Sequence, residues 1–153
     1  MSAFATQNFS KKMKKILIIQ ADFYQHISAL LLEGATKKIK ELGFDYEVIT
    51  VPGALEIPTT IAFAAEAEKY AGYVALGCVI RGETSHYDIV ANESARGLMK
   101  LSIKKKLAIG NGILTVENEA QAIARADPKQ KNKGGFSANA CVEMIKIREN
   151  FLN

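Results

Sequence analysis

The chain contains 153 residues, of which 48% are hydrophobic, 24% are charged and only 3 are proline. This length fits about one domain, and the composition excludes the disordered, collagen-like and low-complexity classes of protein. The net charge of +4 does not indicate a nucleic-acid-binding surface, because four lysines near the N-terminus account for it: Lys11, Lys12, Lys14 and Lys15. We predict a basic, flexible tail over residues 1–15 and one domain over residues 16–153, with no nucleic-acid partner.

The sequence also indicates the compartment. It has no run of about 18 apolar residues, which a membrane span requires, and its tail lacks the apolar segment and cleavage site of a secretory signal. Two cysteines, Cys78 and Cys141, are too few for a disulfide framework. We therefore expect a cytoplasmic protein without a membrane partner, in which both cysteines are reduced core residues.

The first half of the chain alternates strand and helix patterns. A β-branched apolar run over residues 16–20 predicts a strand buried on both faces. Apolar residues at helical spacing predict a helix over residues 27–42, and a second strand is expected over residues 46–51. A helix of small residues then begins near Pro58 and continues to Gly72.

The second half repeats this alternation. The apolar run 73–80 is the most strand-like segment, and a long helix is expected over residues 86–104. The fourth strand is predicted over residues 107–114, followed by a short helix from 115 to 127. An amphipathic pattern over residues 136–151 predicts the final helix.

This order of elements is typical of right-handed βαβ crossovers. The predicted fold is α/β: a three-layer sandwich with a four-stranded, mostly parallel, flavodoxin-like sheet and helices on both faces. Ligands of such folds bind at the carboxyl ends of the strands. The segments in which to seek chemistry are therefore 21–24, 52–56, 81–86 and the turn near Thr115.

The segment after the third strand is a candidate anion site. Ser85 and Asp88 have the spacing of a capping box, so a helix is expected to begin here with free backbone N–H groups. Gly82 and the Thr84 hydroxyl lie beside that helix start, and phosphate is the most common metabolite anion. Because capping alone explains Ser85 and Asp88, a plain capped helix remains the alternative.

Individual residues at the strand ends carry further hypotheses. His86 is the first candidate for proton transfer near neutral pH, whereas His26 is expected at the surface. Cys78 lies inside the apolar run and is expected to be a buried, inert thiol. Glu56 either binds sugar-like hydroxyls or is an ordinary first-turn acid. Phe23 either anchors its loop or forms a platform for a heteroaromatic ring.

A basic loop follows the predicted short helix. Arg125 ends that helix, and Lys129, Lys131 and Lys133 follow. Such a charge run is usually only solvated, but the suspected phosphate site at Thr84 makes Arg125 a candidate phosphate clamp. The sequence has no Walker-type or dinucleotide glycine motif and no metal-spaced Cys/His set, so we expect no cofactor and no metal.

Five motifs, in order and spacing, make the chain similar to a known family. They are VPGALEIP (51–58), LGCVIRGETSHYD (76–88), NGILTVEN (111–118), QAIARA (121–126) and NKGG (132–135). Through them, residues 16–151 resemble the 6,7-dimethyl-8-ribityllumazine synthases, or lumazine synthases, of riboflavin biosynthesis. The resemblance implies a transferase that condenses 5-amino-6-(D-ribitylamino)uracil with 3,4-dihydroxy-2-butanone 4-phosphate and releases phosphate and water, without cofactor or metal.

The resemblance also assigns binding roles for the pyrimidine substrate. Its ring would stack on Phe23, and its ribityl hydroxyls would bind Glu56. The backbone around four residues would hold its polar edges: Ala54, Leu55, Val79 and Ile80. Asn111 stands where many members carry an aromatic residue over the substrate, and it is counted among the expected substrate-binding residues.

Phosphate binding and proton transfer are assigned to five other residues. Glu83 and Thr84 would bind phosphate together with Arg125. His86 would shuttle protons during imine formation, phosphate elimination and ring closure, and Lys133 would assist it. In the family the site lies between subunits of a pentamer, and the adjacent chain supplies the residues matching Arg125 and Lys133.

The resemblance leaves the assembly and the catalytic activity as separate questions. Some members form a capsid of twelve pentamers and carry glycines in the loop before NKG; residues 127–131 lack them, which favours a free homopentamer. One alternative function is a non-catalytic lumazine- or flavin-binding protein on the same fold. Another is a flavodoxin-like or response-regulator signalling module, although the third strand does not end in an acid suited to phosphorylation.

Overall fold

In residues 14–152, which the computed structural model describes, four parallel strands form the middle layer of the fold. They are β1 (Lys15–Ala21), β2 (Asp45–Val51), β3 (Gly72–Ile80) and β4 (Ile109–Val116). The strand order is β2-β1-β3-β4, and each neighbouring pair is parallel. This arrangement confirms the predicted α/β fold with a parallel sheet.

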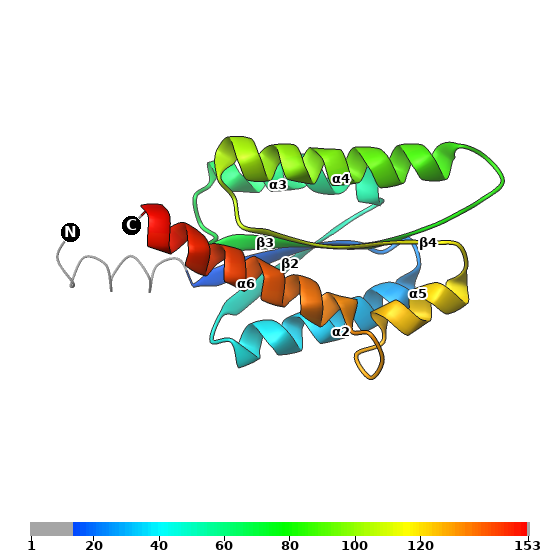
Figure 1. Ribbon diagram of the computed structural model, residues 1–153, viewed down its shortest axis with the longest axis horizontal. Coiled ribbons are helices and arrows are strands. Elements are labelled where there is room, and N and C mark those ends of the chain that lie inside the picture. Colours follow the sequence, from blue (N-terminus) through cyan, green and yellow to red (C-terminus); the bar gives the residue numbers. More distant parts are fainter. Residues whose placement is uncertain (1–13, 153) are drawn as a thin grey trace.

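Helices cover both faces of the sheet (Figure 1). One face carries α2 (Gln25–Glu41), α5 (Glu119–Ala126) and α6 (Lys133–Leu152). The other carries α3 (Ile57–Glu66) and α4 (His86–Lys105), and a short 3-10 helix, η1 (Ala54–Glu56), precedes α3. None of the helices within the described residues combines the length and apolar character that crossing a membrane requires.

The central strand β1 explains why the fold has two cores. Side chains of a strand point alternately to its two faces. Ile16 and Ile18 pack with α2 and α6, whereas Leu17 and Ile19 pack with α3 and α4, and all four are fully buried. The prediction that the apolar run 16–20 forms a strand covered on both faces agrees with this burial.

Several element boundaries differ from the sequence predictions. Helix α3 ends at Glu66 rather than near Gly72, because Glu68 adopts a left-handed backbone conformation with φ of 53°. Strand β4 ends at Val116, two residues later than expected, and α5 begins at Glu119 because Asn118 caps it. Helix α6 begins at residue 133, three residues before the predicted start.

The predicted flexible tail extends too far into the chain. Lys15 begins β1, and the Lys14 carbonyl accepts a hydrogen bond from the Asp45 N–H at 3.0 Å. Lys15 thus belongs to the sheet, because the first strand begins one residue before its apolar run, and Lys14 is hydrogen-bonded just outside it. The prediction for residues 1–13 lies outside the described residues.

The contact between α6 and β4 leaves no room for a side chain at Gly110. A Cβ there would overlap the Ser137 carbonyl, which is fixed helix backbone. We expect Gly110→Ala to lower the free energy of unfolding by at least ~1–3 kcal/mol, the usual cost of overpacking. Urea unfolding measures this loss. Gly82→Ala is the control, since a Cβ at Gly82 meets nothing within 4 Å, and equal stability of the two variants would contradict the prediction.

Candidate active site

A pocket of about 400 Å³ opens at the carboxyl ends of the strands. Ligands of parallel α/β sheets bind at this edge. The lining comes from the segments that follow β1 and β2, from the end of β3 and from the start of α4: Phe23, Tyr24, Gly53, Ala54, Leu55, Glu56, Cys78, Val79, Ile80, Gly82, Thr84, His86, Tyr87 and Val90.

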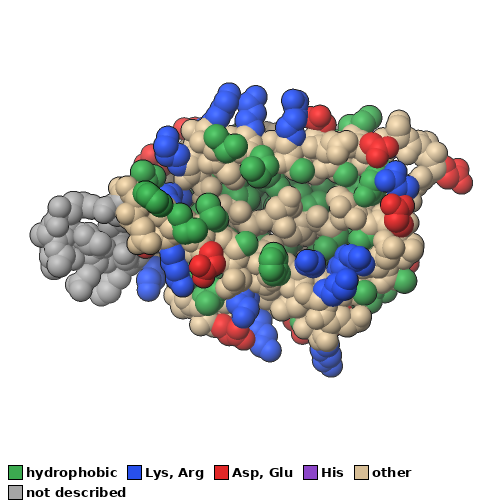
Figure 2. Space-filling view, in the orientation of Figure 1, with side chains coloured by type: hydrophobic (Ala, Val, Ile, Leu, Met, Phe, Trp, Pro, Cys, Tyr) green, Lys and Arg blue, Asp and Glu red, His purple; other side chains and the backbone are tan. Residues whose placement is uncertain are grey.

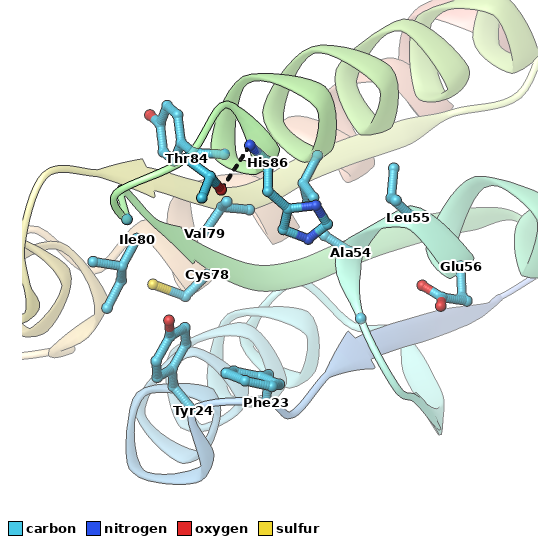
Figure 3. A pocket seen from close by; sticks show the side chains of 14 residues that line it. Phe23, Tyr24, Ala54, Leu55, Glu56, Cys78, Val79, Ile80, Thr84 and His86 are labelled. Carbon is cyan, nitrogen blue, oxygen red and sulfur yellow. Dashed lines mark hydrogen bonds between the residues drawn. The ribbon is translucent and has the colours of Figure 1, made fainter.

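Eight of the twelve predicted site residues lie in this one pocket (Figure 3). They come from four separate stretches of sequence, so only the fold brings them together: Phe23, Ala54, Leu55, Glu56, Val79, Ile80, Thr84 and His86. The other four, Glu83, Asn111, Arg125 and Lys133, are not part of the lining.

The loop between β3 and α4 is built as a cradle of backbone donors. Within residues 14–152, the N–H groups of residues 82–85 take part in none of the hydrogen bonds. The His86 N–H donates to the Thr84 hydroxyl at 3.3 Å, and the N–H groups of Asp88 and Ile89 donate to the Ser85 carbonyl. Unpaired N–H groups before a helix attract anions, so the loop suits a phosphate group.

The predicted capping box is wrong. Ser85 has helical dihedral angles, φ −73° and ψ 0°, and its side chain makes no capping hydrogen bond. A capping side chain needs an extended backbone at its own residue. The Thr84 hydroxyl instead accepts the hydrogen bond from the first N–H of α4. The Asp88 carboxylate lies 3.5 Å from the Arg81 guanidinium.

The imidazole of His86 extends from the first residue of α4 toward the space between β3 and the loop that carries Phe23 (Figure 3). The Phe23 ring is 75% exposed at the pocket rim and contacts Tyr24 edge to face, with 4.9 Å between ring centroids. An exposed ring at a pocket mouth offers a flat apolar surface for stacking. A planar ligand held there would lie within the same pocket as a proton-transfer group.

Glu56 supplies the acidic side of the pocket. It ends η1 and precedes α3, where the Thr60 hydroxyl donates to its carbonyl at 2.8 Å. The carboxylate makes no ion pair within residues 14–152. Its oxygens are therefore free to accept hydrogen bonds from ligand hydroxyls.

Sequence reasoning gave no binding role to five lining residues, Tyr24, Gly53, Cys78, Tyr87 and Val90, and it named Gly82 only as a neighbour of the anion site. Tyr24 adjoins Phe23 in the same loop. Tyr87 and Val90 lie one and four positions beyond His86 in α4, and helical spacing from His86 was a usable signal for Val90. Cys78 was expected to be buried, yet it is only partly buried because its side chain borders the pocket.

The Cys78 thiol is nevertheless a poor nucleophile. Burial raises its pKa to about 11, so at neutral pH it stays protonated. Cys141 is buried between α6 and the sheet, and burial raises its pKa to about 12. Both cysteines are free, as expected. Neither offers covalent chemistry near pH 7.

The remaining predicted residues lie elsewhere. The Asn111 side chain accepts a hydrogen bond from the Ile113 N–H at 3.0 Å and borders a second hollow between β4 and α4. Arg125 donates to the Gln121 carbonyl at 3.1 Å, and the Lys133 ammonium lies 5.0 Å from the centre of the Phe136 ring. Glu83 is exposed in the loop before α4.

As far as the described residues go, the lining of the pocket of one chain contains no lysine or arginine. It has an aromatic platform, a carboxylate, an imidazole and a backbone cradle, but a bound phosphate would meet no cation. Among residues 14–152, no group of three His, Cys, Asp or Glu side chains is arranged to hold a metal ion.

Comparison with known proteins gives one consistent result. Residues 13–149 match the sequence pattern of the family described as 6,7-dimethyl-8-ribityllumazine synthase. A protein of that name from Novosphingobium aromaticivorans is 60% identical over 137 residues, which cover 90% of this chain and 98% of the relative. Proteins of the same name from Bartonella tribocorum and Zymomonas mobilis are 57% and 56% identical, covering 92% and 90% of this chain and 96% and 98% of the relatives.

Proposed function

The chain belongs to the 6,7-dimethyl-8-ribityllumazine synthase family, and we propose that the pocket at its strand ends is the catalytic site. The activity is the condensation of 5-amino-6-(D-ribitylamino)uracil with 3,4-dihydroxy-2-butanone 4-phosphate to 6,7-dimethyl-8-ribityllumazine, with release of phosphate and water. The chain is thus a transferase of riboflavin biosynthesis. Since its relatives are named as synthases, nothing favours the non-catalytic binding protein.

One observation carries the assignment of the site: eight residues from four segments, each with a role in this chemistry, line a single pocket. The pyrimidine ring stacks on Phe23, and the ribityl hydroxyls donate to the Glu56 carboxylate. The backbone near two pairs of residues holds the polar edges of the ring: Ala54 and Leu55, and Val79 and Ile80. Asn111 lies outside this pocket and borders the neighbouring hollow.

The other end of the pocket receives the phosphorylated ketone. The phosphate accepts hydrogen bonds from N–H groups of the loop that includes Glu83 and from the Thr84 hydroxyl. His86 lies beside this loop, where its imidazole moves protons during imine formation, phosphate elimination and ring closure. Holding two small polar substrates in one orientation supplies up to ~7–11 kcal/mol, more than a single acid–base group does.

A second copy of the chain supplies the missing cations. Arg125 and Lys133 do not line the pocket of their own chain, so they complete the pocket of an adjacent subunit in a homopentamer. Large apolar side chains lie exposed on both helical layers: Phe63, Met99 and Ile103 on α3 and α4, and Phe136, Met144, Ile147 and Phe151 on α6. Figure 2 shows apolar side chains, in green, at the surface of the face bordered by α4 and α6. Such exposure is typical of protein–protein interfaces.

The assembly is a free homopentamer rather than a capsid of twelve pentamers, and it works in the cytoplasm without a cofactor. The loop over residues 127–131 contains no glycine and is held by hydrogen bonds between its own residues. Asp127 accepts hydrogen bonds there from the Lys129 N–H at 2.9 Å and the Gln130 amide at 3.2 Å.

The function and the assembly are tested together. Purified protein is mixed with both substrates, and lumazine absorbance is followed against a protein-free control. We expect accelerated formation of the product by a particle of five times the chain mass of 16.7 kDa, measured by light scattering. A well-folded oligomer without acceleration would contradict the catalytic site, and an active monomer would contradict the shared pocket.

A further inference from the structure

The loop that carries Thr84 and leads to His86 is attached to the protein mainly at its two ends. Residues 81–85 are all exposed, and the N–H groups of residues 82–85 make no hydrogen bond within residues 14–152. At the start of the loop, the Arg81 N–H donates to the Val116 carbonyl at 2.9 Å. At the other end, α4 begins with His86. Something must hold these two ends in a fixed relation if the loop is to bind phosphate in one geometry.

The Arg81 side chain connects the two ends. Its Nε lies 2.9 Å from the Glu117 carboxylate, just beyond the end of β4, and its NH1 lies 3.5 Å from the Asp88 carboxylate in the first turn of α4. The guanidinium also stacks over the Tyr87 ring, 4.2 Å from its centre. The backbone of Arg81 follows the end of β3, and its guanidinium contacts both α4 and the residue that follows β4.

Arg81 itself is not part of the lining of the substrate pocket. Arg81 borders the second hollow, with Asp88 and Asn111, whereas Tyr87 borders both hollows. Arg81 therefore acts on the ligand only through other residues. Its side chain is 43% exposed, and ion pairs this exposed contribute little to stability. Its effect is expected on the placement of the loop more than on the free energy of unfolding.

We propose that Arg81 is a positioning residue that holds the start of α4 against the ends of β3 and β4, and so fixes His86 and the phosphate-binding loop. The inference rests on the proposed role of that loop. Lysine does not replace arginine here, because an ammonium lacks the planar fork that pairs with two carboxylates and stacks on a ring.

Steady-state kinetics of Arg81→Lys test the proposal. We expect kcat to fall and the KM for the butanone phosphate to rise by about tenfold each, because a misplacement near 1 Å costs up to about 100-fold in rate. The KM for the ribitylaminouracil should change less than twofold, since Phe23 and Glu56 are held by other elements. The control is Arg96→Lys, which alters an exposed arginine of α4 paired with Glu93 at 3.2 Å and should leave all three constants unchanged.

A double variant separates positioning from a general structural effect. If Arg81 acts through His86, Arg81→Lys should lower kcat much less in a His86→Ala background than in the wild type. Glu117→Gln, which weakens one contact and retains the side-chain shape, is a second variant if Arg81→Lys fails to fold, and it should raise the same KM. Wild-type constants in these variants, or an equal rise of both KM values, would overturn the proposal. Absence of product formation by the wild type would instead overturn the proposed function.

Discussion

His86→Ala is expected to lower kcat by about 10²–10⁴-fold while the protein remains folded and oligomeric. The imidazole begins α4 beside the phosphate-binding loop and lines the pocket. Each stage of the condensation moves protons, and imidazole is the side chain best suited to that task near neutral pH. The described lining contains one carboxylate, that of Glu56, and it is assigned to ribityl hydroxyls.

The measurement is steady-state formation of lumazine with both substrates saturating, so that a change in KM does not conceal the loss of kcat. His26→Ala is the matched control, because His26 is exposed and pairs with Glu119 at 2.6 Å outside the pocket. Added imidazole should restore part of the activity of His86→Ala but not alter the control. An unchanged kcat in His86→Ala would mean that orientation of the substrates provides the acceleration and that His86 is structural.

The sheet could be predicted because its strands have the sequence signature of burial on both faces. The runs ILII in β1 and YVAL in β3 are continuous and apolar, which a helix on the surface of a small domain would not be. Because the strands run parallel, the loops at their carboxyl ends must lie at one edge of the sheet. Because Phe23, Glu56 and His86 each follow a different strand, their positions in the sequence were enough to predict that they share one site.

Local geometry within the site could not be predicted in the same way. The spacing of Ser85 and Asp88 fits a capping box, but the backbone angles of Ser85 decide whether its side chain reaches an N–H, and spacing does not reveal them. The Arg81 guanidinium also packs on the Tyr87 ring, a contact that the spacing of the two residues does not reveal. Arg81 itself stood in a recognised motif without an assigned role, since its partner Glu117 lies 36 residues away.

Arg125→Ala is expected to lower kcat/KM for the butanone phosphate by about 100-fold, because hydrogen bonds between charged groups contribute about 1.5–3 kcal/mol each. Binding of the ribitylaminouracil should change little, since its partners lie at the other end of the pocket. Separate KM values and direct titration of each substrate measure the difference. Lys129→Ala is the control, as it removes a charge from the adjacent loop where only the backbone N–H is used. Equal losses for both substrates would contradict a phosphate clamp.

Mixed oligomers then show which subunit supplies Arg125. Neither His86→Ala nor Arg125→Ala subunits alone contain a complete site. If His86 and Arg125 act from neighbouring chains of a ring, an equal random mixture has both groups intact at about a quarter of its interfaces, so about a quarter of the wild-type activity should return. If a single chain supplied both groups, every site in the mixture would lack one of them and no activity would return. The first outcome is favoured because Arg125 lies on α5 outside its own pocket lining, and no lysine or arginine of residues 14–152 belongs to that lining.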